Sequence, residues 1–183
     1  MCKAGDRRMK ARLLPIYVNG RNEREIGEFE EQINKIAELY GEEAELLPAV
    51  GLGETISGEA DMIVFPQLMG EIFKCGEALR AISKPAVVIT SGFGTVEMWD
   101  WEIAAWLREE LEMTVFFPYS QEMAKVIFRA AATKREMKKG KKFLMFQDEP
   151  GEGMQAYLFK RFYWWDSSCT DKMERAFGIK IIY

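Results

Sequence analysis

Short apolar runs that alternate with longer segments of helical periodicity constrain the fold of this chain more than any other feature. Residues 62–65 and 86–90 are almost continuously apolar, which is typical of strands buried on both faces of a parallel sheet. Between such runs, apolar residues recur three and four positions apart, as on the buried side of a helix. The alternation predicts an α/β fold with a mostly parallel sheet and helices on both faces.

Seven strand-like runs are expected. They lie at residues 13–18, 44–50, 60–66, 86–90, 114–117, 143–146 and 179–183. The second run is the weakest because Pro48 interrupts it. A long helix is expected from about residue 152 to residue 177, with Gly178 as its cap. The order of elements predicts a doubly wound, flavodoxin- or Rossmann-like arrangement in a single domain at residues 11–183, after a polar extension at residues 1–10.

Composition limits the class of protein. Of 183 residues, 48% are hydrophobic and 30% are charged, which is typical of a globular domain. The net charge of −4 argues against a nucleic-acid surface. Since no apolar run is long enough for a bilayer, no membrane contact is expected. The three cysteines are far apart and form no CxxC pair, so a reducing, cytoplasmic location is expected.

The chain contains no histidine. Histidine is the commonest general base near neutral pH and the commonest metal ligand, so its absence removes the usual catalytic triads and metal centres. We therefore expect no histidine-based catalysis within these residues, and we assign no catalytic residue, metal ligand or cofactor to them. The last residues, 179–183, have the apolar pattern of a buried strand, and the sequence stops within that strand. This pattern suggests a domain taken from a longer protein.

Ligands of open parallel sheets bind beyond the carboxyl ends of the strands, and two loops there contain candidate residues. Arg21 follows the first strand and offers a planar set of donors for a carboxylate, a phosphate or sugar hydroxyls. Its alternative role is an ion pair with Glu23 or Glu25. The sequence Ser-Gly-Phe-Gly-Thr at residues 91–95 precedes a helix, and its glycines allow the backbone to approach a ligand. Turn geometry alone also explains these glycines.

Ser91 and Gly92 are candidate ligand-binding residues from this loop, and Glu97 and Trp99 follow them. Glu97 lies three residues before Asp100, so the two carboxylates either share a helix face near a ligand or simply oppose the helix dipole. Trp99 falls on the inward stripe of the expected helix. Trp99 and Trp101 project about 160° apart, so one is expected in the core and the other exposed. An exposed tryptophan suits sugar stacking or a subunit contact.

Two features near the end of the chain leave alternatives open. The loop at residues 147–153 contains three carboxylates, which suit Mg²⁺ or Mn²⁺ or acid–base chemistry, or else cap the next helix. Residues 160–165 combine two basic and four aromatic side chains, more than one side of a helix can bury. An interface with another domain or subunit is the preferred interpretation, and stacking on nucleic-acid bases is the weaker one.

Two stretches carry a family resemblance. Residues 91–100 (SGFGTVEMWD) and the expected helix at residues 153–178, with its KRFYWW segment, resemble the L-fucose/L-arabinose isomerase superfamily and its fucose isomerase-like members. The resemblance covers most of the chain from about Leu13 and involves only the N-terminal α/β domain. Its motifs indicate a superfamily and leave the substrate open.

The resemblance implies a function. Such enzymes interconvert aldoses and ketoses, usually with Mn²⁺, and their metal is bound by two carboxylates and a histidine of later domains. The chain is then the N-terminal substrate-contact and assembly domain of a sugar isomerase-like protein, without the metal centre. The implied sugar-contacting residues are Arg21, in general placement, and Trp99. With Ser91, Gly92 and Glu97 they form the predicted substrate-binding set. The sequence up to Tyr183 contains neither the middle nor the C-terminal domain of the family, which departs from the family pattern.

Two other functions remain open. One is a stand-alone flavodoxin-like module that binds a sugar or an anion at residues 91–95. The other is a structural subunit that docks a partner through its aromatic helix. The expected partners are a small sugar and either further copies of the chain or remaining domains of the same polypeptide, with neither nucleic acid nor membrane.

Overall fold

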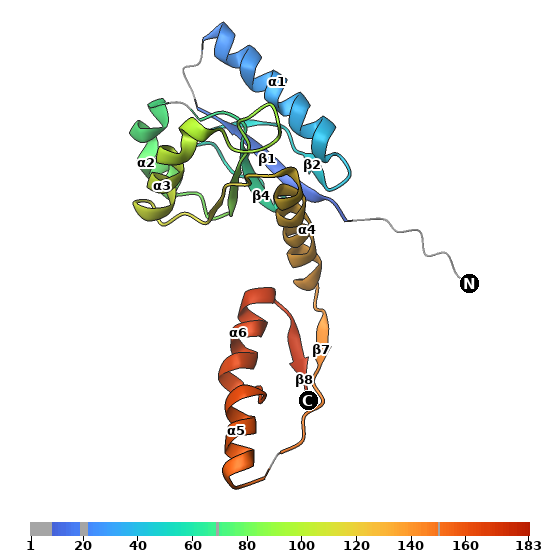
Figure 1. Cartoon of the computed structure of the whole chain (residues 1–183). Helices are drawn as coiled ribbons and strands as arrows, with labels where there is room; N and C mark the ends of the chain where they lie inside the picture. Colours follow the sequence, from blue (N-terminus) through green and yellow to red (C-terminus); the bar gives the residue numbers. More distant parts are fainter. Residues whose placement is uncertain (1–8, 19–21, 69, 150) are drawn as a thin grey trace, which may run out of the picture. The chain divides into compact units, whose positions relative to one another are not determined.

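The computed structural model describes residues 9–18, 22–68, 70–149 and 151–183. Its internal contacts divide the chain into two compact units, Met1–Ala132 and Thr133–Tyr183, where the sequence analysis places a single domain over residues 11–183. The first unit contains a parallel sheet with helices, and the second contains two helices and two strands (Figure 1). Helix α4 (Gln121–Met137) crosses the boundary between them.

The sheet of the first unit has the strand order β2–β1–β4–β5–β6, and every pair in it is parallel. The strands are β1 (Ala11–Tyr17), β2 (Ala44–Leu46), β3 (Val50–Gly51), β4 (Met62–Phe65), β5 (Ala86–Val88) and β6 (Val115–Phe116). The chain runs outward from β1 to β2 and returns past β1 to β4, which is the doubly wound order. The predicted α/β class and mostly parallel sheet are confirmed.

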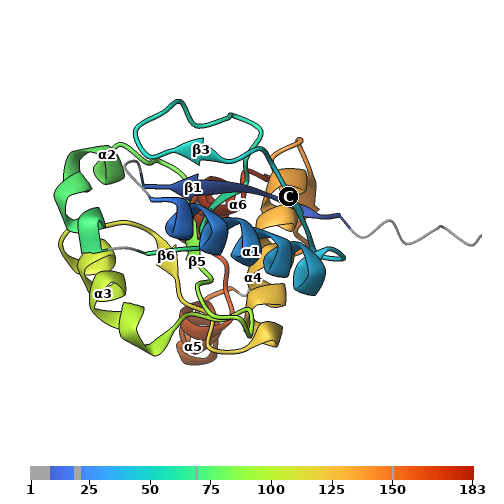
Figure 2. The ribbon, with the colours of Figure 1, turned by 90° about the horizontal axis from the view of Figure 1, so that it is seen from above.

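Strands β2 and β3 form one interrupted edge of the sheet. β2 pairs with the first half of β1 and β3 pairs with its end, as Figure 2 shows for β3 beside β1. Pro48 lies in the gap between them and has no N–H to donate to β1. The weak second strand expected from the sequence is therefore present in two short pieces.

Helices cover both faces of the sheet (Figure 1). On one face, α1 (Glu23–Tyr40) and α4 pack on Met62 and Val64 of β4. On the other face, Ile63 and Phe65 of the same strand meet the 3₁₀ helix η1 (Gly70–Cys75), α2 (Gly76–Arg80) and α3 (Trp101–Glu109). Because neighbouring residues of a strand point to opposite faces, a strand between two helical layers must be apolar throughout.

Both ends of α1 follow local sequence rules. Asn22 and Glu25 form a capping box, in which each side chain accepts the backbone N–H of the other. Gly41 is the C-cap. Between the caps, Phe29, Ile36 and Tyr40 are buried, so α1 has a fixed register on the sheet.

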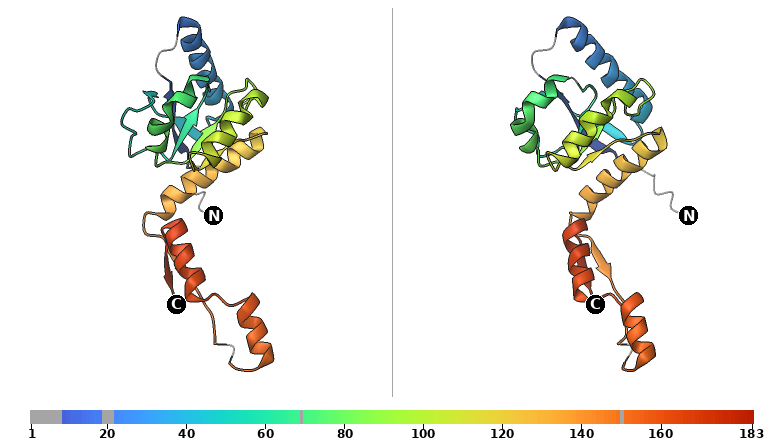
Figure 3. Two further views of the ribbon diagram at one scale, coloured as in Figure 1. Left: turned by 90° about the vertical axis from the view of Figure 1, so that its left-hand side faces the viewer. Right: turned by 60° about the vertical axis from the view of Figure 1, so that its left-hand side comes forward.

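The second unit contains β7 (Lys142–Leu144), α5 (Met154–Phe162), α6 (Ser167–Phe177) and β8 (Lys180–Ile182). β7 and β8 pair with each other in parallel, and among the described residues neither pairs with the larger sheet. α6 lies along these strands (Figure 3), and Glu174 accepts the N–H of Ile181 at 2.7 Å. The sixth and seventh strands are thus confirmed as strands, but they form a separate two-stranded sheet.

The single helix expected from residue 152 to residue 177 is wrong. It is divided into α5 and α6 at residues 163–166, because Asp166 is an N-cap whose carboxylate accepts the N–H of Cys169 at 2.8 Å. This backbone donor holds the pKa of Asp166 below its usual value. Gly178 caps α6 in the left-handed conformation, as predicted.

Candidate functional site

A hollow of about 840 Å³ lies at the carboxyl ends of β4 and β5, beside α1. Its wall combines polar residues on one flank of α1, the residues directly after β4 and part of residues 90–100 after β5. Open parallel sheets bind ligands at this edge, close to the point where the strand order reverses. This hollow, called the α1 pocket below, is the candidate site.

Residues 90–97 form a closed loop rather than the start of a helix. The hydroxyl of Ser91, which is 3% exposed, accepts the backbone N–H groups of Phe93 (3.2 Å) and Thr95 (3.1 Å). The backbone N–H of Ser91 donates to the Thr95 carbonyl, and that of Gly94 donates to the Ser91 carbonyl. The buried side chain of Ser91 therefore fixes the shape of the loop, and it does not line the α1 pocket.

Side chains of α1 hold this loop against the sheet. The amide nitrogen of Gln32 donates to the carbonyls of Ile89 and Ser91, both at 2.9 Å. The fully buried hydroxyl of Tyr40 donates to the carbonyl of Gly94 at 2.5 Å. Burial raises the pKa of Tyr40 to about 12, with smaller contributions from Glu122 and Glu43, so the hydroxyl keeps its proton over the physiological range.

Gly94 is required where the loop passes closest to α1. Its φ of +78° lies in the left-handed region that side chains disfavour. A Cβ built on it would lie 2.7 Å from both Leu39 Cδ1 and Tyr40 Oη. Gly92, in contrast, has open space around it and lines the α1 pocket.

Thr90 connects the end of β5 to the turn that follows the loop. Its hydroxyl donates to Asp100 at 2.5 Å and accepts the backbone N–H of Glu97 at 2.9 Å. Burial raises the pKa of Asp100, the Thr90 hydrogen bond partly opposes that rise, and the nearby Glu97 charge adds to it. All three residues line the α1 pocket.

Trp99 is 82% exposed and lies at the rim of the α1 pocket. It belongs to the 3₁₀ helix η2 (Met98–Asp100), which precedes α3. The expectation that Trp99 points inward is wrong, because the 3₁₀ turn breaks the helical register assumed across residues 96–107. The pairing of one core and one exposed tryptophan is wrong as well, since Trp101 is 47% exposed beside Phe117.

The α1 pocket is acidic. Among the described residues, its wall contains the carboxylates of α1 and of residues 97 and 100 and a single basic group, Lys35, which pairs with Glu38 at 2.9 Å. The carboxylates from α1 are those of Glu28, Glu31 and Glu38. An excess of negative charge disfavours phosphate and other anions. Carboxylates are strong acceptors for hydroxyl groups, and an exposed indole offers a flat apolar face. This combination suits a neutral polyhydroxy compound.

Three of the five predicted site residues, Gly92, Glu97 and Trp99, line the same pocket. Ser91 lies behind it, and Arg21 lies outside the described residues. The sequence analysis did not single out Thr90 or the acidic stripe of α1. Glutamates three and seven residues apart are typical of a solvated helix face, so only the fold reveals that this stripe forms a wall.

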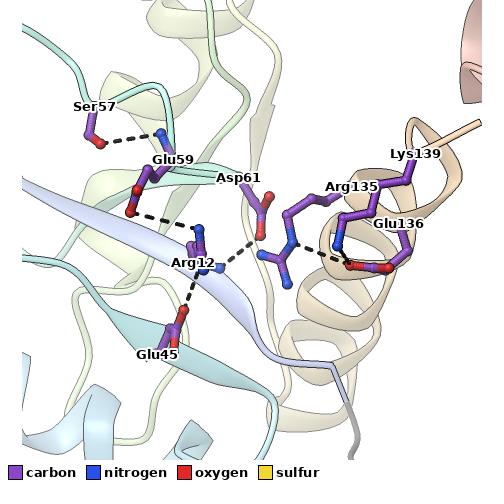
Figure 4. Close-up of polar contacts among 8 residues, drawn as sticks. All are labelled: Arg12, Glu45, Ser57, Glu59, Asp61, Arg135, Glu136 and Lys139. Carbon is purple, nitrogen blue, oxygen red and sulfur yellow. Dashed lines mark hydrogen bonds and ion pairs between the residues drawn. The ribbon is translucent and has the colours of Figure 1, made fainter.

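Two other groups of carboxylates contain ion pairs with basic side chains. Arg12, at the amino-terminal end of β1, pairs with Glu45 at 2.9 Å and Glu59 at 3.7 Å, and its backbone N–H donates to Asp61 (Figure 4). In the loop at residues 147–153, Glu149 pairs with Lys160. In the part of the chain that the structure describes, no three acidic or cysteine side chains are grouped so that they could hold a metal ion.

Comparison with known proteins gives no match, either to a family model or to a curated protein. Among the described helices, none combines the length and the apolar character needed to cross a bilayer.

Gly94→Ala is expected to destabilise the first unit by at least about 2 kcal/mol, because the new methyl group meets α1 and the backbone conformation becomes strained. The matched control is Gly92→Ala, two residues away in open space, for which we expect a change within about 0.5 kcal/mol. Urea denaturation followed by circular dichroism measures both. Equal effects of the two variants would contradict the close contact between the loop and α1.

Proposed function

We propose that this chain is the substrate-contact and assembly domain of a sugar isomerase-like protein, in which the α1 pocket contacts a neutral aldose or ketose. The observation that carries the proposal is the pocket itself, at the ligand-binding edge of the sheet with an acidic wall and an exposed tryptophan at its rim. The resemblance of residues 91–100 to the fucose isomerase-like proteins supports the same function.

The charge of the α1 pocket favours a sugar over the anion considered as an alternative. A phosphate or carboxylate ligand would face Glu97 and Asp100, while the ammonium of Lys35 already pairs with Glu38. Sugar hydroxyls, in contrast, can donate to these carboxylates without bringing further negative charge into the pocket. A stand-alone sugar-binding module remains the second candidate, because it would use the same wall.

The Mn²⁺ that the family resemblance implies does not fit the residues described here. They contain no group of three acidic or cysteine side chains placed to ligate a metal. We therefore assign no metal-dependent step to this chain, and in the proposed function a metal centre belongs to other polypeptide. The contribution of this chain is to orient the sugar.

The assembly part of the proposal rests on the second unit. Among the described residues of this unit, the buried apolar ones are Met145, Ala156 and Ile181. Its large exposed apolar residues are Phe143, Leu144, Phe146, Met154, Tyr157, Leu158, Phe159, Phe162, Tyr163, Trp165, Phe177 and Tyr183. So small a core cannot stabilise a unit of this size, and an apolar surface of this extent is typical of an interface. Further copies of the chain, or further domains, are the proposed partners.

We also propose a cytoplasmic location, which suits sugar metabolism. Both described cysteines, Cys75 and Cys169, are free thiols, and they are compatible with a reducing compartment.

Sugar binding is tested by calorimetric titration of the chain with L-fucose, L-arabinose and arabinose 5-phosphate. We expect at least one neutral sugar to bind and the phosphate to bind more weakly. Trp99→Ala should weaken sugar binding about 3- to 10-fold, because it removes the stacking face at the rim. Trp101→Ala is the control, since Trp101 is also exposed but does not line the pocket.

Two results would contradict this function. One is the absence of heat with either neutral sugar at millimolar concentration. The other is tighter binding of the phosphate, which would favour the anion-binding alternative.

Assembly is tested by sedimentation velocity over a range of chain concentrations. We expect concentration-dependent association that is lost when Phe162 and Tyr163, both highly exposed on or next to α5, are replaced together by serine. Val126→Ser is the control, because Val126 is an exposed apolar residue of the first unit. A monomer at every concentration, or a double variant that associates like the wild type, would count against self-assembly through the second unit.

A further inference from the structure

We propose that Thr90 is a positioning residue of the α1 pocket: its hydroxyl joins the backbone of Glu97 to the carboxylate of Asp100, sets the orientation of Trp99 towards the ligand, and makes sugar binding weaken as the pH falls. This inference deepens the proposed sugar-binding function and rests on it.

The argument starts from the single hydroxyl group of Thr90. A hydroxyl has one proton to donate and two lone pairs that accept. The proton of Thr90 goes to Asp100 Oδ2 at 2.5 Å, and one lone pair accepts the backbone N–H of Glu97 at 2.9 Å. One side chain therefore contacts both ends of the four-residue turn 97–100.

Trp99 depends on this turn for its position. The turn is closed by a hydrogen bond from the Asp100 N–H to the Glu97 carbonyl at 3.1 Å. The side chain of Trp99 makes no hydrogen bond or ring contact with any described residue, and it is largely exposed. Its placement therefore follows from the backbone of the turn, which the Thr90 hydroxyl connects to the end of β5.

The residue before Thr90 makes this connection rigid. Ile89 is fully buried, and the backbone N–H of Thr90 donates to the Thr95 carbonyl at 3.0 Å. The backbone of Thr90 is thus fixed, and its side chain contacts two groups of the pocket, Glu97 and Asp100. A side chain in this position transmits the rigidity of the sheet to the rim of the pocket, and pre-organised binding groups give tighter binding.

Acidification should act through Asp100. Burial, with a smaller contribution from Glu97, raises the pKa of Asp100 above its usual value, and the Thr90 hydrogen bond partly opposes this rise. The other charged groups among the described residues of the pocket wall are Lys35 and the three glutamates of α1. As the pH falls through the raised pKa, Asp100 takes up a proton and its charge-assisted bond to Thr90 weakens. Sugar affinity should then fall.

The raised pKa of Asp100 has the opposite consequence for the stability of the fold: acidification should weaken sugar binding but favour the folded state. A carboxyl group whose pKa is raised on folding favours the folded state when protonated, and it loses that contribution as the pH rises through the folded-state pKa. Ionised Asp100 therefore costs stability at neutral pH. Asp100→Asn, whose amide oxygen can still accept from Thr90, should be at least as stable as the wild type at pH 7 yet bind sugar more weakly.

The experiment compares Thr90→Val, which keeps the shape but removes the hydroxyl, with Thr90→Ser, which keeps the hydroxyl. Thr114→Val is the control, because its exposed hydroxyl makes no hydrogen bond to a described residue. Sugar affinity is measured by calorimetry from pH 4.5 to pH 8. Asp100 is titrated by carboxyl-carbon NMR without ligand, and the Glu97 amide shift is followed in the same samples.

We expect Thr90→Val to weaken sugar binding about 10-fold at pH 7, as the loss of a hydrogen bond to a charged group implies. Its Asp100 titration should move to higher pH, because the hydrogen bond that lowers the pKa is gone. Thr90→Ser should restore affinity and titration, and Asp100→Asn should abolish the acid-dependent loss of binding. A stability role alone would leave the pH profile of affinity unchanged.

The proposal is overturned if Thr90→Val binds sugar like the wild type with the same pH profile, or if Thr90→Ser is as weak as Thr90→Val. Absence of sugar binding by the wild type at every pH contradicts the proposed function itself. In that case the NMR spectra recorded without ligand still test whether Thr90 positions Asp100 and Glu97. A shifted Asp100 titration and Glu97 amide in Thr90→Val support the positioning contact, and unchanged ones overturn it.

Discussion

The hydrogen bonds from α1 to the loop after β5 are the interactions on which the candidate site depends. Gln32 and Tyr40 donate to three backbone carbonyls of residues 89–94, those of Ile89, Ser91 and Gly94. The sheet fixes one end of the loop and α1 fixes its middle. The rim of the α1 pocket is therefore built on rigid elements, as a binding site requires.

The charge of the pocket wall determines which class of ligand the α1 pocket can bind. The glutamates of α1, with Glu97 and Asp100, leave the pocket wall strongly acidic, and the ammonium of Lys35 pairs with Glu38. A neutral polyol gains acceptors from such a wall, whereas an anion meets repulsion.

The fold was largely predictable, because runs such as Met62–Phe65 must be strands when both of their faces are buried. The long helix failed because periodicity ignores a capping side chain such as Asp166, which ends one helix and begins another. At the site, the position of the loop followed from the rule that parallel sheets bind ligands beyond the carboxyl ends of their strands. Three of the predicted site residues line the pocket. The acidic face of α1 and the contacts of Thr90 could not be predicted, since they depend on how distant segments pack.

The most direct test of this account is amide hydrogen exchange of the loop by NMR. The N–H groups of Gly94, Thr95 and Glu97 all donate within the loop or to Thr90, so we expect protection comparable to that of the Ile89 amide, which donates to β4. Exchange of the three loop amides as fast as that of the exposed residues 151–153 would show that α1 does not hold the rim in place, and would contradict the account.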